Sequence, residues 1–284
     1  MGTLMDVAAL KERMDSGKRT VLLDVRWVLG DPHGHDHYLA GHLPGAVFVD
    51  LHHELADPSV SGEGRHPLPA QAALQRSARA WGINDGDTVV AYDDNGNTAA
   101  ARAWWLLRDA GLEPVFLLDG GLAAWRAAGH PVESGEQAAT EGTVTLGHGR
   151  MPSIDMARAA RWAGQGILLD ARAGERYRGE IEPIDPRAGH IPGAISAPTG
   201  ENLAADGRFL PAAQLRSRFA EAGIDGGTAV AVYCGSGVTA AHQIAALEIA
   251  GFPAALYPGS FSQWSSEEAN EVAVGAAPGG SVGA

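Results

Sequence analysis

The chain has a single cysteine, Cys234, among its 284 residues. One cysteine excludes an internal disulfide and a Cys-x-x-Cys redox pair. If Cys234 is reactive, whatever becomes bonded to its sulfur must therefore leave by attack from another molecule. The residue stands in the stretch YCGSGVTA, residues 233–240, where a glycine-rich loop follows an apolar run.

Positive charge and long apolar runs are also scarce. Lys and Arg number 21 against 34 Asp and Glu, which gives a formal net charge of −13. An acidic surface repels phosphate backbones and anionic lipid, so we expect neither a nucleic-acid nor a membrane partner. No apolar run reaches the ~20 residues of a membrane span. Residues 1–14 have the pattern of an amphipathic helix and lack the apolar core of a secretory signal, so we expect a cytoplasmic protein.

The sequence repeats itself in four segments that occur in the same order in both halves. This pattern indicates a duplicated domain. The matched pairs are LLDVR (22–26) with LLDAR (168–172), GHLPGAV (41–47) with GHIPGAI (189–195), DDNGNTA (93–99) with CGSGVTA (234–240), and LDGGLAAW (118–125) with YPGSFSQW (257–264). We predict an N-terminal domain over residues 1–130, a polar, glycine-rich linker over 131–150 and a C-terminal domain over 151–284.

Each half is predicted to be α/β. Short apolar runs bounded by turn residues are typical of buried parallel strands. They occupy residues 20–24, 87–92 and 114–119 in the first half, and 166–170, 228–233 and 254–257 in the second. Helical patterns at 98–111 and 238–251 lie between strands and end in Gly. The alternation predicts, in each half, a mainly parallel sheet flanked by helices on both faces, with ligands bound beyond the carboxyl ends of the strands.

Cys234 lies at such a strand end. Gly235 and Gly237 allow the backbone N–H groups of the loop, including those of Val238 and Thr239, to converge on one point, and the following helix adds partial positive charge. Both effects favour an anionic, nucleophilic sulfur. The competing interpretation is a small buried apolar side chain, which is a common fate of a lone cysteine.

The first repeat has Asp93 in place of the cysteine, which predicts that this domain is catalytically inactive. Its loop also imitates the start of a calcium-binding loop, but the required Gly and the final acidic residue are replaced by Thr98 and Trp104. Cysteine phosphatases use a similar loop that ends in an arginine, whereas no Arg or Lys lies between Cys234 and His242 here. We therefore expect neither calcium binding nor phosphatase activity.

These motifs, taken together, resemble the two-domain rhodanese family of sulfurtransferases over nearly the whole chain. The resemblance implies two tandem rhodanese-like domains, of which the second is catalytic. It implies a ping-pong reaction in which Cys234 takes a sulfane sulfur from a donor, forms a persulfide and passes the sulfur to cyanide or a thiol. No metal or organic cofactor is implied. The alternative is a persulfide carrier that delivers sulfur to a protein partner with little turnover of small molecules.

Thiosulfate and 3-mercaptopyruvate are the donors that the family resemblance implies. The loop CGSG lacks the cationic residues expected for the dianion thiosulfate, and Ser236 offers a hydroxyl instead, so the loop favours 3-mercaptopyruvate. By resemblance, Arg176 binds substrate. Arg187 is the nearest match to a second substrate-binding arginine, although its spacing differs.

Two first-half residues complete the predicted site. By resemblance to the mercaptopyruvate branch, His66 acts with Ser236, but the aspartate expected beside them is His52 here. Trp27 follows the first LLDVR and is a candidate cleft residue. The acceptor remains open between cyanide, a small thiol and thioredoxin or another thiol protein.

Overall fold

The computed structural model describes residues 2–283, which form two compact units. Among the described residues, the first unit contains 2–57, 68–151 and 203–209. The second contains 58–67, 152–202 and 210–283. Two short segments therefore pack with the unit other than the one that surrounds them in sequence. The segment 58–67 carries Arg65 and His66 into the second unit.

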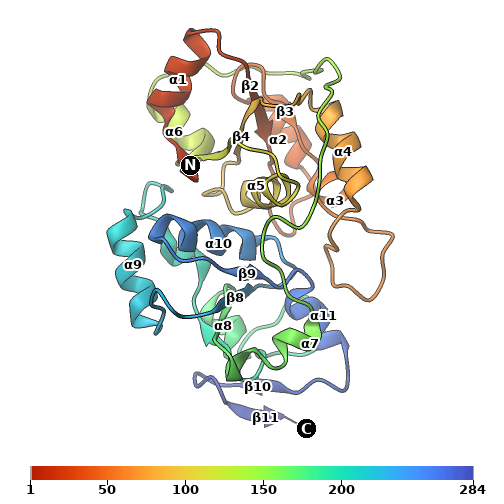
Figure 1. The fold of residues 1–284 in the computed structure, drawn as a ribbon, viewed down its shortest axis with the longest axis vertical. Coiled ribbons are helices and arrows are strands. Elements are labelled where there is room, and N and C mark those ends of the chain that lie inside the picture. Colours follow the sequence, from red (N-terminus) through yellow and green to blue (C-terminus); the bar gives the residue numbers. More distant parts are fainter. Residues whose placement is uncertain (1, 284) are drawn as a thin grey trace. The chain divides into compact units, whose positions relative to one another are not determined.

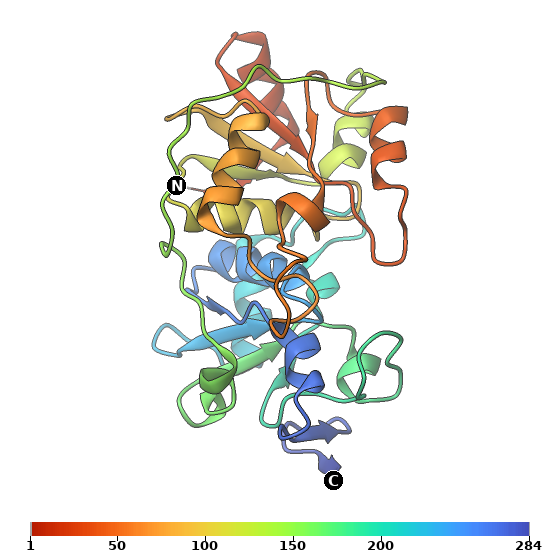
Figure 2. The same ribbon diagram turned by 90° about the vertical axis from the view of Figure 1, so that its right-hand side faces the viewer.

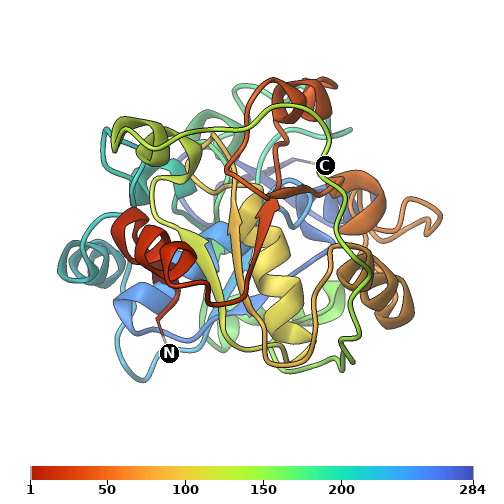
Figure 3. The ribbon, with the colours of Figure 1, turned by 90° about the horizontal axis from the view of Figure 1, so that it is seen from above.

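The first unit is built on a five-stranded parallel sheet in the order β1-β5-β4-β2-β3. Figure 1 labels β2, β3 and β4 of this sheet. Its strands are β1 (Leu4–Met5), β2 (Thr20–Asp24), β3 (Val47–Phe48), β4 (Thr88–Tyr92) and β5 (Val115–Leu118). Its helices are α1 (Val7–Asp15), α2 (Gly34–Ala40), α3 (Leu51–Glu54), α4 (Gln71–Ala80), α5 (Ala100–Asp109) and α6 (Gly121–Ala127). Figure 3 shows α1 and α6 on one side of this sheet and α4 and α5 on the other.

The second unit repeats the plan with a four-stranded parallel sheet in the order β7-β6-β8-β9. Its strands are β6 (Ile167–Asp170), β7 (Ile195–Ser196), β8 (Val230–Tyr233) and β9 (Ala255–Leu256), and an antiparallel hairpin, β10 (Val272–Val274) and β11 (Ser281–Gly283), follows near the C-terminus (Figure 2). Its helices are α7 (Met156–Ala159), η1 (Trp162–Gly164), α8 (Gly174–Tyr177), η2 (Thr199–Asn202), α9 (Ala212–Glu221), α10 (Thr239–Ala250) and α11 (Ser260–Ser266).

The predicted α/β fold with a parallel sheet in each repeat is confirmed, and the predicted strands end within a residue or two of the observed ones. Each central strand is buried on both faces, as its continuous apolar run requires. Leu22, Val90 and Trp125 belong to the first core, and Leu168, Ala231 and Trp264 to the second. The helices α5 and α10 pack against the two central strands, β4 and β8.

The prediction of a helix over residues 1–14 was wrong at its start. Leu4 and Met5 form β1, which pairs with β5. The helix α1 begins at Val7 because Asp6 caps it: the Asp6 carboxylate accepts a hydrogen bond from the Ala9 N–H group at 2.7 Å. Met1 lies outside the described residues.

The segment 131–150 contains no α-helix and no extended strand, and backbone hydrogen bonds attach it to the first unit. The N–H groups of Val144 and Gly147 donate to the carbonyls of Ile83 and Ala110 at 3.1 and 2.8 Å. Among the described residues, no helix combines the length and apolarity that crossing a membrane requires.

Candidate active site

Cys234 follows the last residue of β8 and is almost fully buried, with 1% of its surface exposed. Its Sγ accepts a hydrogen bond from the Gly237 N–H group at 3.2 Å. Val238 is the N-cap of α10 and Thr239 is its first residue, so the Thr239 N–H group belongs to the first turn, whose N–H groups lack intrahelical acceptors. The sulfur therefore lies where backbone dipoles stabilise negative charge.

The start of α11 fixes the shape of this loop. The Phe261 and Ser262 N–H groups donate to the carbonyls of Cys234 and Gly235 at 2.9 and 2.8 Å. Gly237 has a φ of +78°, and a β-carbon there would lie 2.4 Å from the Pro258 carbonyl oxygen. Only glycine fits this position without distortion.

The corresponding loop of the first unit holds an anion of its own. The buried Asp93 carboxylate accepts hydrogen bonds from four backbone N–H groups at 2.7–3.1 Å, those of Asn95, Asn97, Ala99 and Ala100. Burial raises the pKa of the Asp93 carboxyl, and the four bonds act against this effect. The repeat thus contains direct evidence that this strand–loop–helix arrangement gathers N–H groups around a negative group.

These bonds also bear on the calcium-like pattern of residues 93–98. The Asp93 oxygens point at N–H donors, which a cation would have to displace. Among residues 2–283, no group of three or more His, Cys, Asp or Glu side chains is arranged to hold a metal ion.

Ser236 and His66 come together in the second unit. The Ser236 Oγ and His66 Nδ1 atoms are 2.8 Å apart, and both residues are buried. The pair forms because the segment 58–67 packs into the second unit. Ser236 is two residues from Cys234 in the same loop, so a hydroxyl–imidazole pair that can move a proton belongs to the loop that carries the sulfur.

Arg176 also lies at the loop, in a chain of alternating charges. Its guanidinium donates to Glu182 Oε1 at 2.6 Å and to Asp185 Oδ2 at 3.1 Å. Burial acts to raise the pKa of Glu182, but hydrogen bonds from Arg176 and from backbone N–H groups outweigh it, so that pKa lies below its usual value. For Asp185 burial prevails, and its pKa is raised although Arg65 and Arg176 lie beside it.

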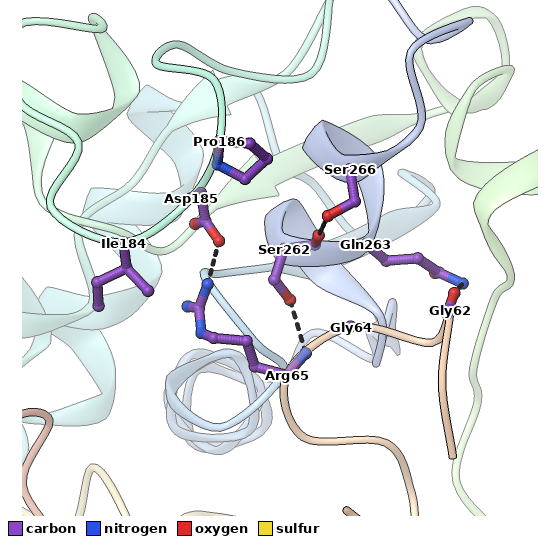
Figure 4. Close-up of a pocket in the computed structure, with 9 residues that line it drawn as sticks. All are labelled: Gly62, Gly64, Arg65, Ile184, Asp185, Pro186, Ser262, Gln263 and Ser266. Atoms are coloured by element: carbon purple, nitrogen blue, oxygen red, sulfur yellow. Dashed lines mark hydrogen bonds and ion pairs between the residues drawn. The ribbon is translucent and has the colours of Figure 1, made fainter.

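Arg65 is a site residue that the sequence reasoning missed. It forms an ion pair with Asp185, and its backbone N–H donates to Ser262 Oγ at 3.0 Å (Figure 4). A β-carbon at position 235 would lie 2.8 Å from Nη2 of Arg65 and 3.5 Å from Nη1 of Arg176. The available signal was its position directly before His66.

Arg187 does not join this group, contrary to its predicted role in substrate binding. Its guanidinium donates to the backbone carbonyls of Trp264, Ser265, Glu267 and Asn270 at 2.7–3.3 Å. These carbonyls belong to the end of α11 and the loop after it. The arginine therefore satisfies the acceptors that a helix leaves unpaired at its C-terminus.

Trp27 belongs to the first unit, where its Nε1 donates to His52 Nε2 at 3.0 Å. The predicted role of Trp27 in a cleft stays a prediction. His52 is exposed and occupies the position where an aspartate was expected.

A cavity of about 310 Å³ opens beside the loop in the second unit (Figure 4). Arg65, Asp185, Ser262 and Gln263 are among the residues that line it. Cys234 does not line the cavity, but Ser262 bonds the carbonyl of the next residue, Gly235. A small polar molecule in this cavity would therefore lie against the charged side chains that surround the loop.

The chain matches known proteins over nearly its whole length. Residues 6–128 and 153–267 each match the Rhodanese-like domain family. A Mycobacterium tuberculosis protein, provisionally named a thiosulfate sulfurtransferase, is 48% identical over 96% of this chain and 98% of its own. A Pseudomonas aeruginosa protein, provisionally named a 3-mercaptopyruvate sulfurtransferase, is also 48% identical, over 90% of this chain and 92% of its own.

Among solved structures, the Escherichia coli 3-mercaptopyruvate sulfurtransferase SseA is 30% identical. It superposes with a TM-score of 0.82 and covers 92% of this chain and 100% of its own. Two matched domains, two relatives of nearly equal length and a shared fold agree with the duplicated cradle and the single cysteine described above. The chain therefore belongs to the rhodanese family.

Proposed function

We propose that this chain is a sulfurtransferase that moves a sulfane sulfur from 3-mercaptopyruvate or thiosulfate to a thiophilic acceptor through a persulfide on Cys234. One observation carries the proposal. The buried Cys234 sulfur accepts a hydrogen bond from the Gly237 N–H group, in the loop that leads into α10. The sulfurtransferase names of the relatives agree with it.

The reaction balances without an external oxidant. The Cys234 thiolate attacks the sulfur of 3-mercaptopyruvate, an S–S bond forms, and the C–S bond breaks with its electron pair on carbon. A proton then converts the resulting enolate to pyruvate, while the persulfide keeps one negative charge. Cyanide attacks the outer sulfur, forms thiocyanate and returns Cys234 as a thiolate. Since no second cysteine exists to resolve the persulfide, the acceptor must be external.

The local chemistry favours 3-mercaptopyruvate as donor. Its pyruvate product must be protonated on carbon, and Ser236 with His66 at 2.8 Å supplies a group that can deliver the proton. Thiosulfate leaves as sulfite, which needs no such proton. In addition, Arg65 and Arg176 are already balanced by Asp185 and Glu182, so the site offers little excess positive charge to a dianion.

We further propose a reducing, cytoplasmic environment and a thiol acceptor such as thioredoxin, because the cycle needs Cys234 in its reduced form. The alternative function, a carrier that passes the persulfide to a protein partner, uses the same first step. The two functions differ in turnover: the enzyme cycles with small acceptors, whereas the carrier stops after one sulfur is loaded.

Steady-state kinetics with both donors test this proposal. We expect 3-mercaptopyruvate to have the higher kcat/KM with cyanide as acceptor. Ser236→Ala should lower kcat with 3-mercaptopyruvate by about 100-fold, the scale of general acid catalysis, and change the thiosulfate rate only a few-fold. A loss that is equal for both donors would contradict the protonation role. A single turnover with either donor would favour the carrier.

A further inference from the structure

The start of α11 holds the first two peptide units of the catalytic loop. The Phe261 N–H group donates to the Cys234 carbonyl at 2.9 Å, and the Ser262 N–H group donates to the Gly235 carbonyl at 2.8 Å. The C=O and N–H groups of a planar trans peptide point in opposite directions. The N–H groups of Gly235 and Ser236 therefore point away from α11. The position of α11 thus decides where these two N–H groups can stabilise negative charge.

A buried arginine stacks on the Phe261 side chain. The Arg172 guanidinium carbon lies 3.9 Å from the centroid of the Phe261 ring, and both residues are buried. Asp170 and Gly189 hold the guanidinium in place: its Nη2 atom donates to Asp170 Oδ2 and to the Gly189 carbonyl, both at 2.6 Å. A cation–π contact is strongest when it is desolvated, as it is here. The stack therefore ties the start of α11 to the last residue of β6.

The first unit has the same backbone bond without the aromatic ring. Leu122 stands where the repeat places Phe261, and its N–H group donates to the Asp93 carbonyl at 3.0 Å. Arg26 corresponds to Arg172 and is paired with a buried aspartate at the same distance of 2.6 Å. A leucine has no π face for the guanidinium. The aromatic ring at this position therefore accompanies the cysteine, whereas the arginine and the backbone bond are common to both units.

We propose that Arg172 and Phe261 are positioning residues for the chemistry of Cys234. Their stack holds the start of α11, and α11 in turn aims the Gly235 and Ser236 N–H groups at the negative charge that the sulfur carries as a thiolate or a persulfide. The persulfide in this inference rests on the proposed function, whereas the thiolate does not. Arg172 and Phe261 are not among the described residues that line the cavity, so their role is not substrate binding.

Alkylation of Cys234 by iodoacetamide tests the inference without a sulfur donor. The thiolate forms a C–S bond with the reagent and iodide leaves, so the rate at a fixed pH reports how well the loop stabilises the thiolate. Phe261→Leu gives the second unit the residue of the first. It should lower this rate about tenfold, which corresponds to about 1.4 kcal/mol and lies within the range of a desolvated cation–π contact.

Phe219→Leu is the matched control for the lost volume. Phe219 is a fully buried phenylalanine of the same unit, but it belongs to α9 and not to α11 or the loop. Its replacement should leave the alkylation rate at the wild-type value. An equal fall in Phe219→Leu, or no fall in Phe261→Leu, would overturn the inference. Faster alkylation of Phe261→Leu would also overturn it, because Phe261 would then only shield the sulfur.

Fluorinated phenylalanines at position 261 separate the charge contact from the volume. Successive ring fluorines change the shape little and weaken the negative face of the ring, so the alkylation rate should fall stepwise. Arg172→Lys keeps the charge and loses the planar stack, so it should slow alkylation in the wild-type background and have little further effect in Phe261→Leu. Arg26→Lys makes the same change in the first unit and should leave the rate unchanged. A rate that does not respond to fluorination would refute the role of Arg172.

Sulfur transfer from 3-mercaptopyruvate to cyanide completes the test. Phe261→Leu should lower kcat and leave KM within about twofold, since a residue that does not bind substrate affects the reacting state alone. If alkylation responds as expected and no donor is turned over, the positioning role stands and the proposed function fails. If sulfur is transferred and the alkylation rates are unchanged, the reverse holds.

Discussion

At the scale of residues, the site depends on a loop whose backbone N–H groups donate hydrogen bonds to the side chain at its first position. Four N–H groups surround Asp93 in the first unit, and the same strand–loop–helix plan surrounds Cys234 in the second. The first position of the loop thus holds a carboxylate in one unit and a thiol in the other. This contrast supports reading the loop as the anion site and the sulfur as its reactive occupant.

Gly237→Ala tests whether the loop shape is required. The residue has a φ of +78°, and its new β-carbon would lie 2.4 Å from the Pro258 carbonyl oxygen. We expect a loss of about 1–3 kcal/mol of stability and a loss of sulfur transfer greater than tenfold, measured by urea unfolding and by thiocyanate formation. Gly226→Ala is the control, since nothing lies within 4 Å of a β-carbon there. Equal effects at both glycines would refute the argument.

At the scale of elements, α11 is the support on which the catalytic loop rests. Its first residues bond the Cys234 and Gly235 carbonyls, and Arg187 caps its C-terminal end. The cap leaves Arg187 no bond to the loop itself. Its contribution should therefore be to stability.

Arg187→Gln should cost about 2–3 kcal/mol of unfolding free energy, because several partly buried carbonyls lose a charged donor. The KM for the sulfur donor should stay within about twofold, for Arg187 does not reach the loop. Unfolding curves and donor titrations of the same preparation measure both. If the unfolding free energy is unchanged and the KM rises tenfold, Arg187 binds substrate and does not act as the C-terminal cap of α11.

The elements also differ in how far their structure can be predicted from the sequence. Apolar runs placed the central strands, and the repeat placed the two cradles, because both depend on local pattern. The partners of Arg65 and Arg187 depend on which distant segment each loop packs against, and neither periodicity nor spacing encodes that. The segment 58–67 is the clearest case: it follows first-unit residues in sequence and packs with the second unit.

At the scale of the whole molecule, the duplicated fold buries an Asp–Arg pair at the carboxyl end of a strand in each sheet. We expect the pair in the first unit to make the free energy of unfolding depend on pH. Burial raises the pKa of Asp24 to about 6 from 3.8, although Arg26 lies 2.6 Å away and acts to lower it. The folded state then holds this proton more tightly than the unfolded state does. The stability from Asp24 is thus fully present below pH ~4 and is lost as the pH rises through about 6.

Unfolding free energies of wild type and Asp24→Asn between pH 4 and 7 test this sign. Relative to the variant, the wild type should lose roughly 3 kcal/mol between pH 4 and 6, the free energy of a shift of about two pKa units, and then level off. Parallel curves, or a wild type that gains stability over this interval, would show that the Asp24 pKa is not raised in the folded protein.

The central claim for the molecule is that Cys234 carries the transferred sulfur. The most direct measurement is the intact mass of wild type and Cys234→Ser after brief exposure to 3-mercaptopyruvate or thiosulfate, followed by cyanide. We predict that only the wild type gains the mass of one sulfur atom, faster from 3-mercaptopyruvate, and that cyanide removes it as thiocyanate. No gain in the wild type, or the same gain in Cys234→Ser, would contradict the account.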